Sequence, residues 1–208
     1  MGSRTICDRG SSRELAEHPS HTESVVPCAP DRPLHCLWGE AIVEINQSKT
    51  KTKSLIAATA FATATLAAGA LGGRTSRPGL WYRTLRKSKA NPPASVFGPV
   101  WSALYAAMAY SAWRVWRSPA STERSRALRL WAVQLGLNAA WSPTFFAAKN
   151  PRASLAIVAT LLPTLGEYVR AAWKVDRLAA AVMLPYLGWS SFATYLNAQI
   201  VSKNSFRL

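Results

Sequence analysis

Between residues 185 and 197 the chain reads Pro185-Tyr186-Leu187-Gly188-Trp189-Ser190-Ser191-Phe192-Ala193-Thr194-Tyr195-Leu196-Asn197. This stretch is apolar and rich in aromatic residues, yet it carries small polar groups that a lipid-facing helix avoids. An unpaired polar group in hydrocarbon costs several kcal/mol, so Ser190, Ser191 and Asn197 should face protein or a ligand. Tryptophan and tyrosine offer an apolar ring face and one donor each. The stretch therefore predicts a membrane helix with an inward polar and aromatic side.

Five apolar segments occupy the chain beyond residue 50, at about 54–73, 95–116, 127–148, 152–173 and 178–201. As an α-helix, about 20 residues reach about 30 Å, the thickness of the hydrocarbon core of a bilayer. Such segments leave little room for a soluble domain in residues 51–208. The sequence therefore predicts an all-α fold, a bundle of five transmembrane helices, and hence a multi-pass integral membrane protein.

Residues 1–50 have a different composition. They are rich in serine, proline and charge, and they hold seven of the ten acidic residues. Because they show no sustained hydrophobic period, we expect a disordered N-terminal extension. The segment lacks the apolar core of a secretory signal, and its acids are unusual for a transit peptide. An extension of this kind suggests a eukaryotic organelle membrane, which could be mitochondrial, plastid or endoplasmic reticulum.

Residues 51–208 are strongly basic, with twenty of the 25 lysines and arginines and three of the ten acids. A basic, tryptophan-rich region can indicate nucleic-acid binding. Here the charges cluster between the apolar segments, as in loops that contact anionic lipid headgroups. We therefore expect membrane lipids as partners and no nucleic acid. The two sides of the bundle would carry eleven and ten basic residues, which does not define the membrane orientation.

Chemistry-bearing side chains are scarce in the hydrophobic part. All three cysteines and all three histidines lie in the first 36 residues, so residues 51–208 have no thiolate and no imidazole. The sequence has no paired acid and base and no nucleophile beside a base. It therefore predicts no catalytic residues, no metal site and no obligatory cofactor. Glu167 is the acid well inside a predicted span, where Arg170 could neutralise it or its side chain could reach the interface.

Three residue pairs have helical spacing. Trp101 and Tyr105 are four apart, Asn138 and Trp141 are three apart, and Trp189 and Ala193 are four apart, so each pair shares a helix face. These faces could line a ligand site. Bundle packing, an interfacial aromatic belt or, for Asn138, an interhelical hydrogen bond are the alternatives.

Small residues recur every fourth position on the third predicted span, at Ala132, Gly136 and Ala140. Such a stripe lets two helices approach closely. It is a candidate homodimer contact, and packing inside one chain is the equal alternative.

Four sequence blocks follow in order along residues 54–204. They are Trp81-Tyr82 with Leu85 and Lys87; Asn91-Pro92-Pro93 with Val96-Phe97, Val100-Trp101, Leu104-Tyr105 and Met108; Leu137-Asn138 with Trp141-Ser142-Pro143 and Phe145-Phe146; and Pro185-Tyr186-Leu187 with Trp189, Phe192-Ala193-Thr194 and Leu196-Asn197. In this order and spacing the chain resembles the translocator protein family, also called tryptophan-rich sensory protein or peripheral-type benzodiazepine receptor.

The resemblance implies a five-helix membrane bundle, commonly dimeric, that binds porphyrins, sterols and synthetic aromatic ligands. It implies a pocket opening toward the long first loop. By this analogy the pocket would be lined by Trp101, Tyr105, Asn138, Trp141, Trp189, Ala193 and Leu196, with Trp81 in the lid. The loop departs from the family in lacking an aromatic before the double proline and in adding Lys89, which favours a more anionic ligand. The base after Tyr195 is too distant for the animal cholesterol motif.

These observations support three hypotheses. The first is a membrane receptor or translocator that binds tetrapyrroles (porphyrin or haem), with a sterol second, and acts in their transport, sensing or stress regulation. The second, which the resemblance allows, is light- and oxygen-dependent porphyrin degradation through pocket tryptophans. The third is an interaction scaffold that recruits partners through residues 1–50.

Overall fold

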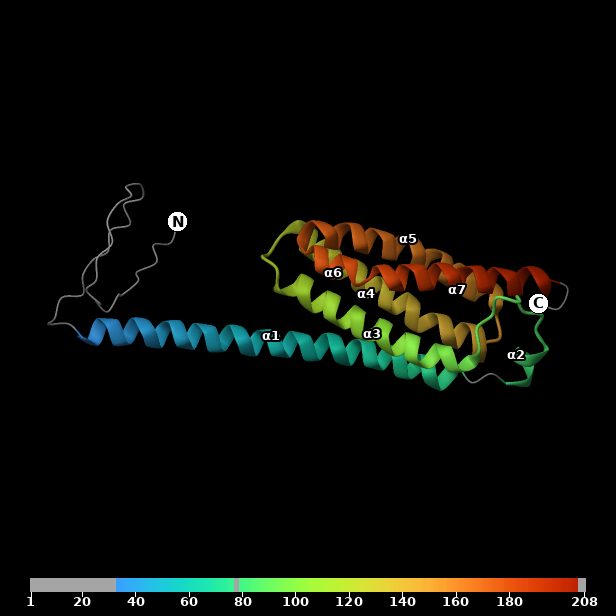
Figure 1. Cartoon of the computed structure of the whole chain (residues 1–208), viewed down its shortest axis with the longest axis horizontal. Coiled ribbons are helices and arrows are strands. Elements are labelled where there is room, and N and C mark those ends of the chain that lie inside the picture. Colours follow the sequence, from blue (N-terminus) through green and yellow to red (C-terminus); the bar gives the residue numbers. More distant parts are fainter. Residues whose placement is uncertain (1–32, 77–78, 206–208) are drawn as a thin grey trace, which may run out of the picture. The chain divides into compact units, whose positions relative to one another are not determined.

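The computed structural model describes residues 33–76 and 79–205, with side chains from residue 45 onward. This part of the chain is almost entirely helical and contains no strand, which confirms the all-α prediction. Its elements, in order, are α1 (Pro33–Thr75), α2 (Leu80–Thr84), α3 (Ala94–Arg117), α4 (Thr122–Ser142), the π-helical turn η1 (Pro143–Ala147), α5 (Pro151–Val175), α6 (Arg177–Ala181) and α7 (Leu184–Lys203). The five long helices α1, α3, α4, α5 and α7 correspond to the five predicted spans (Figure 1).

The chain divides into two compact units, Met1–Lys53 and Ser54–Leu208. The first unit differs from its prediction, because α1 already begins at Pro33 and residues 33–50 are helical rather than disordered. After Pro33 this stretch has no further proline, so no residue within it lacks the N–H that a continuous helix needs. The prediction for residues 1–32 lies outside the described residues.

Two helices are long and apolar enough to cross a membrane by length and composition, at Ile45–Thr75 and Pro151–Val175. Both contain a predicted span. The helices α3, α4 and α7 do not meet this criterion: they carry tryptophan, tyrosine, serine or amide side chains, and the first turns of α4 also hold Glu123 and three arginines. The aromatic, serine and amide side chains are those that make up the polar and aromatic interior.

Prolines interrupt two of the predicted spans. The span 127–148 is divided at Pro143, after which the helix widens and the Ala148 N–H donates to the Pro143 carbonyl at 2.9 Å. The span 178–201 is not continuous either, since α6 ends at Ala181 and α7 begins at Leu184. Pro185 lies in the first turn of α7, a position that tolerates proline because the N–H that it lacks would have no partner there.

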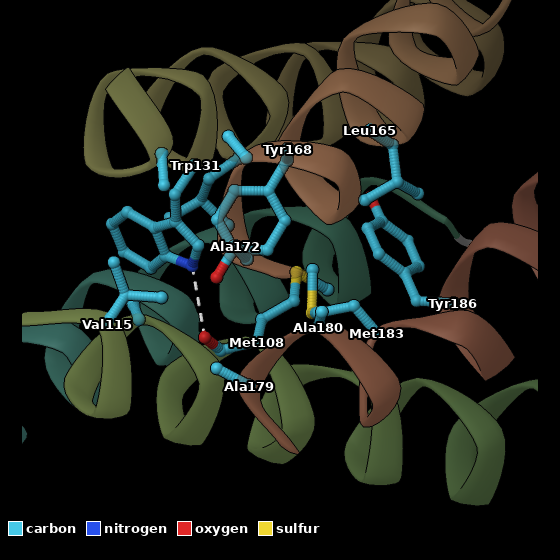
Figure 2. Close-up of a cluster of buried hydrophobic side chains, with 14 of the residues drawn as sticks. Met108, Val115, Trp131, Leu165, Tyr168, Ala172, Ala179, Ala180, Met183 and Tyr186 are labelled. Carbon is cyan, nitrogen blue, oxygen red and sulfur yellow. Dashed lines mark hydrogen bonds between the residues drawn. The ribbon is translucent and has the colours of Figure 1, made fainter. Parts of the chain in front are cut away.

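The core of the second unit lies among α3, α4, α5 and the α6–α7 segment (Figure 2). Met108, Leu165 and Tyr186 are fully buried there, and the Trp131 indole N–H donates to the Met108 carbonyl at 3.0 Å. Small residues such as Ala172 and Ala180 are also fully buried, because they let neighbouring backbones approach closely. This packing fixes the helix positions from which the aromatic side chains project.

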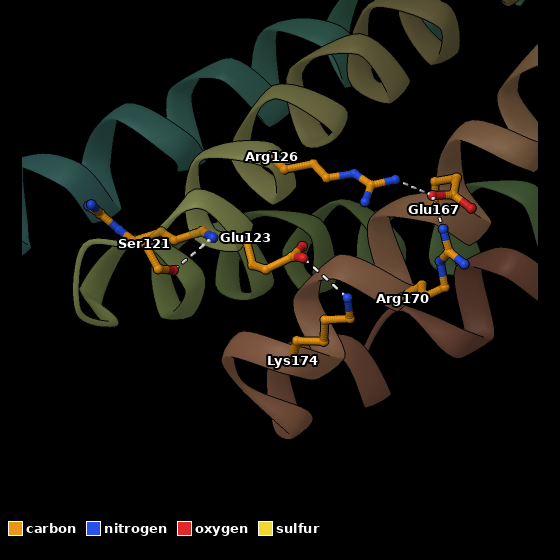
Figure 3. Close-up of polar contacts among 7 residues, drawn as sticks. Ser121, Glu123, Arg126, Glu167, Arg170 and Lys174 are labelled. Carbon is orange, nitrogen blue, oxygen red and sulfur yellow. Dashed lines mark hydrogen bonds and ion pairs between the residues drawn. The ribbon is translucent and has the colours of Figure 1, made fainter.

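We call one end of the bundle the turn end, formed by residues 111–126 and 167–183. Here the Ser111 hydroxyl donates a hydrogen bond to the Ala179 carbonyl at 2.6 Å. It therefore accepts a hydrogen bond from the Tyr168 hydroxyl. The three acids of residues 51–208 all lie at this end, and all are paired: Glu123 with Lys174 at 3.1 Å, Glu167 with Arg126 at 2.6 Å and Arg170 at 3.0 Å, and Asp176 with Arg114 at 2.8 Å. Figure 3 shows the first two of these groups.

We call the opposite end the lid end, formed by residues 72–76, 141–152 and 200–205 and by the lid segment, residues 79–93. Ser142 of α4 is within hydrogen-bond distance of the Thr75 and Ser76 hydroxyls, at 2.9 and 2.6 Å. It also lies 3.2 Å from the Gly72 carbonyl, so it ties the last turn of α1 to α4. No acidic side chain of residues 51–208 belongs to this end.

Candidate functional site

A chain of three polar side chains crosses the bundle. The Tyr105 hydroxyl of α3 donates to Asn138 Oδ1 of α4 at 2.8 Å, and Asn138 Nδ2 donates to the Tyr186 hydroxyl of α7 at 3.0 Å. Two predicted site residues, Tyr105 and Asn138, are therefore in direct contact. The interhelical alternative for Asn138 also holds, because its amide joins three helices. Tyr186 is fully buried and is not among the predicted site residues.

Trp101 extends this chain into an aromatic group. Its ring lies 5.4 Å from Tyr105 and 6.2 Å from Tyr186, between ring centres. Gly69 of α1 also lies against Tyr105: a Cβ added to this glycine would be 3.0 Å from the tyrosine ring. Only glycine fits beside this tyrosine unless the ring shifts, so Gly69 lets α1 close against the site.

A second aromatic cluster centres on Phe145, which the predicted site did not include. The Trp141 ring stacks on Phe145 at 5.3 Å, and Trp81 of α2 meets the same ring edge-on at 5.8 Å. Tyr82 and Phe146 complete the cluster at 6.1 and 4.8 Å from Phe145. The predicted lid residue Trp81 and wall residue Trp141 are thus joined through Phe145. The signal that could have found Phe145 was its position four residues after Trp141 on one helix face.

Trp189 forms a third group, on α7. Its ring partners among the described residues are Phe97 of α3 at 5.8 Å and Phe192 at 6.0 Å, rather than Trp101 or Trp141. Ala193 is half-buried and Leu196 is buried. Phe97, Trp101 and Tyr105 follow one another at four-residue intervals on α3, so this single face connects the Trp189 group to the Asn138 chain.

One buried donor in the Phe145 cluster is unused. Trp141 Nε1 has no hydrogen-bond partner among the described residues, although it is buried. A buried donor without an acceptor costs about 1–3 kcal/mol, so such groups are uncommon and often functional. Trp141 therefore combines a stacked aromatic environment with a free hydrogen-bond donor.

The surroundings of the lid segment are basic. The lid end contains Arg74, Arg83, Arg86, Lys87, Lys89, Lys149, Arg152 and Lys203. The Lys87 ammonium lies 4.4 Å from the centre of the Tyr82 ring, a cation–π distance. Burial raises the pKa of the Tyr82 phenol above its ordinary value, and a hydrogen bond to the Asn91 side chain lowers it in part, so this phenol is neutral at pH 7. The positive field at this end is therefore not offset by acidic side chains.

The small-residue stripe lies on the surface of the chain. Ala132, Gly136 and Ala140 of α4 are all exposed, and nothing lies within 4 Å of a Cβ placed on Gly136. Packing inside the chain, the alternative for this stripe, therefore does not use it. The predicted pairing of Glu167 with Arg170 is present, and Arg126 of α4 pairs with the same carboxylate.

The fold and the aromatic interior define a helical membrane protein with a cluster of tryptophans and tyrosines below a basic lid. Comparison with known proteins agrees: residues 60–202 match the model of the TspO/MBR family. The chain is 39% identical over 119 residues to human translocator protein, covering 56% of this chain and 70% of that protein. It is 34% identical over 137 residues to the tryptophan-rich sensory protein of Cereibacter sphaeroides, covering 66% of this chain and 85% of that protein. It is 36% identical over 145 residues to the tryptophan-rich protein TspO of Chlorobaculum tepidum, covering 67% of this chain and 90% of that protein. The chain belongs to the TspO/MBR family.

Proposed function

We propose that this protein binds a flat, apolar, anionic ligand inside its bundle at the lid end, and that it takes part in the transport, sensing or stress regulation of that ligand. A tetrapyrrole such as protoporphyrin or haem fits best, and a sterol is the second choice. The names of the relatives, translocator protein and tryptophan-rich sensory protein, agree with a role in translocation or sensing.

The observation that carries this proposal is the Trp141 indole N–H within the Phe145 cluster, which has no acceptor in the described part of the chain. An acceptor on a bound ligand would recover the free energy that this buried donor loses. The adjoining stacked rings favour a flat ligand, because aromatic faces attract each other in offset-stacked arrangements. The basic side chains of the lid end would attract carboxylates such as propionates by long-range field and charge-assisted hydrogen bonds.

The binding test is a porphyrin titration of the full-length protein in lipid nanodiscs, followed through porphyrin absorbance and fluorescence. Trp141→Phe keeps an aromatic ring and removes only the donor, so we expect roughly tenfold weaker binding. Trp173→Phe is the matched control, since Trp173 is 48% exposed and lies away from the cluster on α5. Unchanged affinity in Trp141→Phe would contradict the proposed site.

The same titration distinguishes the two tetrapyrroles. Residues 51–208 contain no histidine or cysteine to serve as a strong axial ligand of iron. We therefore expect metal-free protoporphyrin to bind about as tightly as haem. A strong preference for haem would indicate iron ligation by another group.

We further propose that the five long helices each cross the bilayer, in an organelle membrane, and that two copies associate through α4. The exposed stripe of Ala132, Gly136 and Ala140 supports the dimer, because it allows close backbone approach. Gly136→Leu should abolish a cross-linked dimer in native membranes. The matched control is Val133→Leu, since Val133 is exposed on the same helix.

A further inference from the structure

Asn204, just after α7, holds the lid segment by its backbone. The Arg86 N–H donates to Asn204 Oδ1 at 3.0 Å, and Asn204 Nδ2 donates back to the Arg86 carbonyl at 3.0 Å. The second Nδ2 hydrogen reaches the Ile200 carbonyl at 2.8 Å. Both donors of the amide are therefore used. The side-chain amide pairs with the backbone N–H and the carbonyl of Arg86, as the backbone of a neighbouring β-strand would.

This amide is as buried as the apolar core, with Asn204 only 2% exposed. A buried amide costs free energy unless its groups are bonded, and here the bonds depend on the lid being in place. When the lid segment moves away, the Arg86 backbone and the Asn204 side chain must find water instead. The pair therefore favours one discrete, closed position of the lid.

The bonded residue lies next to the candidate site. Leu85 precedes Arg86, is buried, and packs with Phe145 and Ile200. Phe145 in turn stacks on Trp141 and contacts Trp81. Fixing the Arg86 backbone thus fixes Leu85 over the cluster that contains the free Trp141 donor.

We propose that Asn204 is a positioning residue that latches the lid segment, so that it sets how fast ligand enters and leaves the site. The gating part of this inference rests on the proposed function. A latch stabilises the closed lid in the free and the liganded protein alike. Loosening it should therefore raise the association and dissociation rates together and change the equilibrium affinity little.

The first experiment needs no ligand. Hydrogen–deuterium exchange is measured on full-length protein in nanodiscs for wild type, Asn204→Ala and Asn204→Asp. We expect the Arg86 amide to exchange roughly tenfold faster in Asn204→Ala. Asn204→Asp retains the acceptor and loses the donor, so it should be intermediate. Ser202→Ala, at an exposed position near the end of α7, is the matched control and should match wild type. Equal Arg86 exchange in wild type and Asn204→Ala would overturn the latch.

The second experiment measures protoporphyrin kinetics by stopped flow. We expect both rate constants to rise roughly tenfold in Asn204→Ala, with the dissociation constant within about threefold of wild type. If Asn204→Ala folds poorly, Arg86→Pro removes the lid N–H from the other side. Leu85 before it has φ −68° and ψ 138°, a conformation that tolerates a following proline. Arg86→Ala is the control for the lost side chain.

The two proposals fail in different ways. If wild type binds porphyrin with the expected dependence on Trp141 but the Asn204→Ala rates are unchanged, gating by the latch is overturned and the binding function stands. If wild type binds no porphyrin, the proposed function fails, and the exchange of the Arg86 amide alone decides whether Asn204 holds the lid.

Discussion

At the turn end, each acid of residues 51–208 is paired with a base, whereas the basic residues of the lid end have no acidic side chain near them. Among the described residues, one buried polar atom lacks a partner at each end, Glu123 Oε2 at the turn end and Trp141 Nε1 at the lid end. The two ends therefore differ in charge: the turn end holds every side-chain carboxylate of residues 51–208, each paired with a base, and the charged side chains of the lid end are all basic. Paired charges join the helices to one another, and basic side chains without acids nearby can attract an anionic ligand. The difference indicates that stability and binding can be changed separately.

The largest effect should come from Asp176, at the turn end. Its Oδ1 accepts the Ala179 N–H at 2.9 Å and caps α6, and its Oδ2 pairs with Arg114. Asp176→Ala removes both interactions and should lower the free energy of unfolding by about 2 kcal/mol. Asp176→Asn keeps a capping oxygen and should cost about half as much. The measurement is thermal unfolding in detergent with a parallel porphyrin titration. A large loss of porphyrin affinity would contradict the idea that stability and binding can be changed separately.

A smaller effect is expected from neutralising the lid. Replacing Arg86, Lys87 and Lys89 by glutamine removes three positive charges near the Phe145 cluster. Protoporphyrin affinity should fall about three- to tenfold, mainly through slower association at low salt, because charge steers encounter. A porphyrin dimethyl ester has no carboxylates and should bind all variants alike. Equal losses for both porphyrins, or a lowered melting temperature, would mean that these bases act through structure instead.

The smallest effect is a pH dependence at the turn end. Burial raises the pKa of Asp176, but the Ala179 N–H and the Arg114 guanidinium lower it more, so the net pKa lies below its ordinary value. A lowered folded-state pKa contributes stability above the unfolded value of about 3.9, and this contribution is lost as the pH falls through the folded value. Wild type should therefore lose stability below about pH 4 more steeply than Asp176→Asn. Parallel pH profiles for the two proteins would show that the carboxylate charge contributes nothing.

The sequence predicted much of the lid-end chemistry but not its connections. Trp81 and Trp141 were expected near one site, and Phe145, a residue of the π-helical turn Pro143–Ala147, contacts both rings. Asn138 was expected to face either a ligand or another helix, and it bonds Tyr105 and Tyr186. A hydrogen bond between residues 48 positions apart depends on helix order and rotation, and spacing along one helix carries no information on either.

The sequence by itself determined the all-α class, the position of the five long helices and the family, since hydropathy, helical period and the order of aromatic motifs are properties of the linear chain. It misjudged residues 33–50, where composition resembled a disordered tail although α1 already begins at Pro33. Only the tertiary structure decided that Trp141 keeps a free donor, that Gly69 faces the Tyr105 ring and that Asn204 bonds the Arg86 backbone. The last two depend on groups from different elements meeting at about 3 Å, and the first on no acceptor among the described residues reaching the indole N–H; packing rather than sequence spacing decides all three.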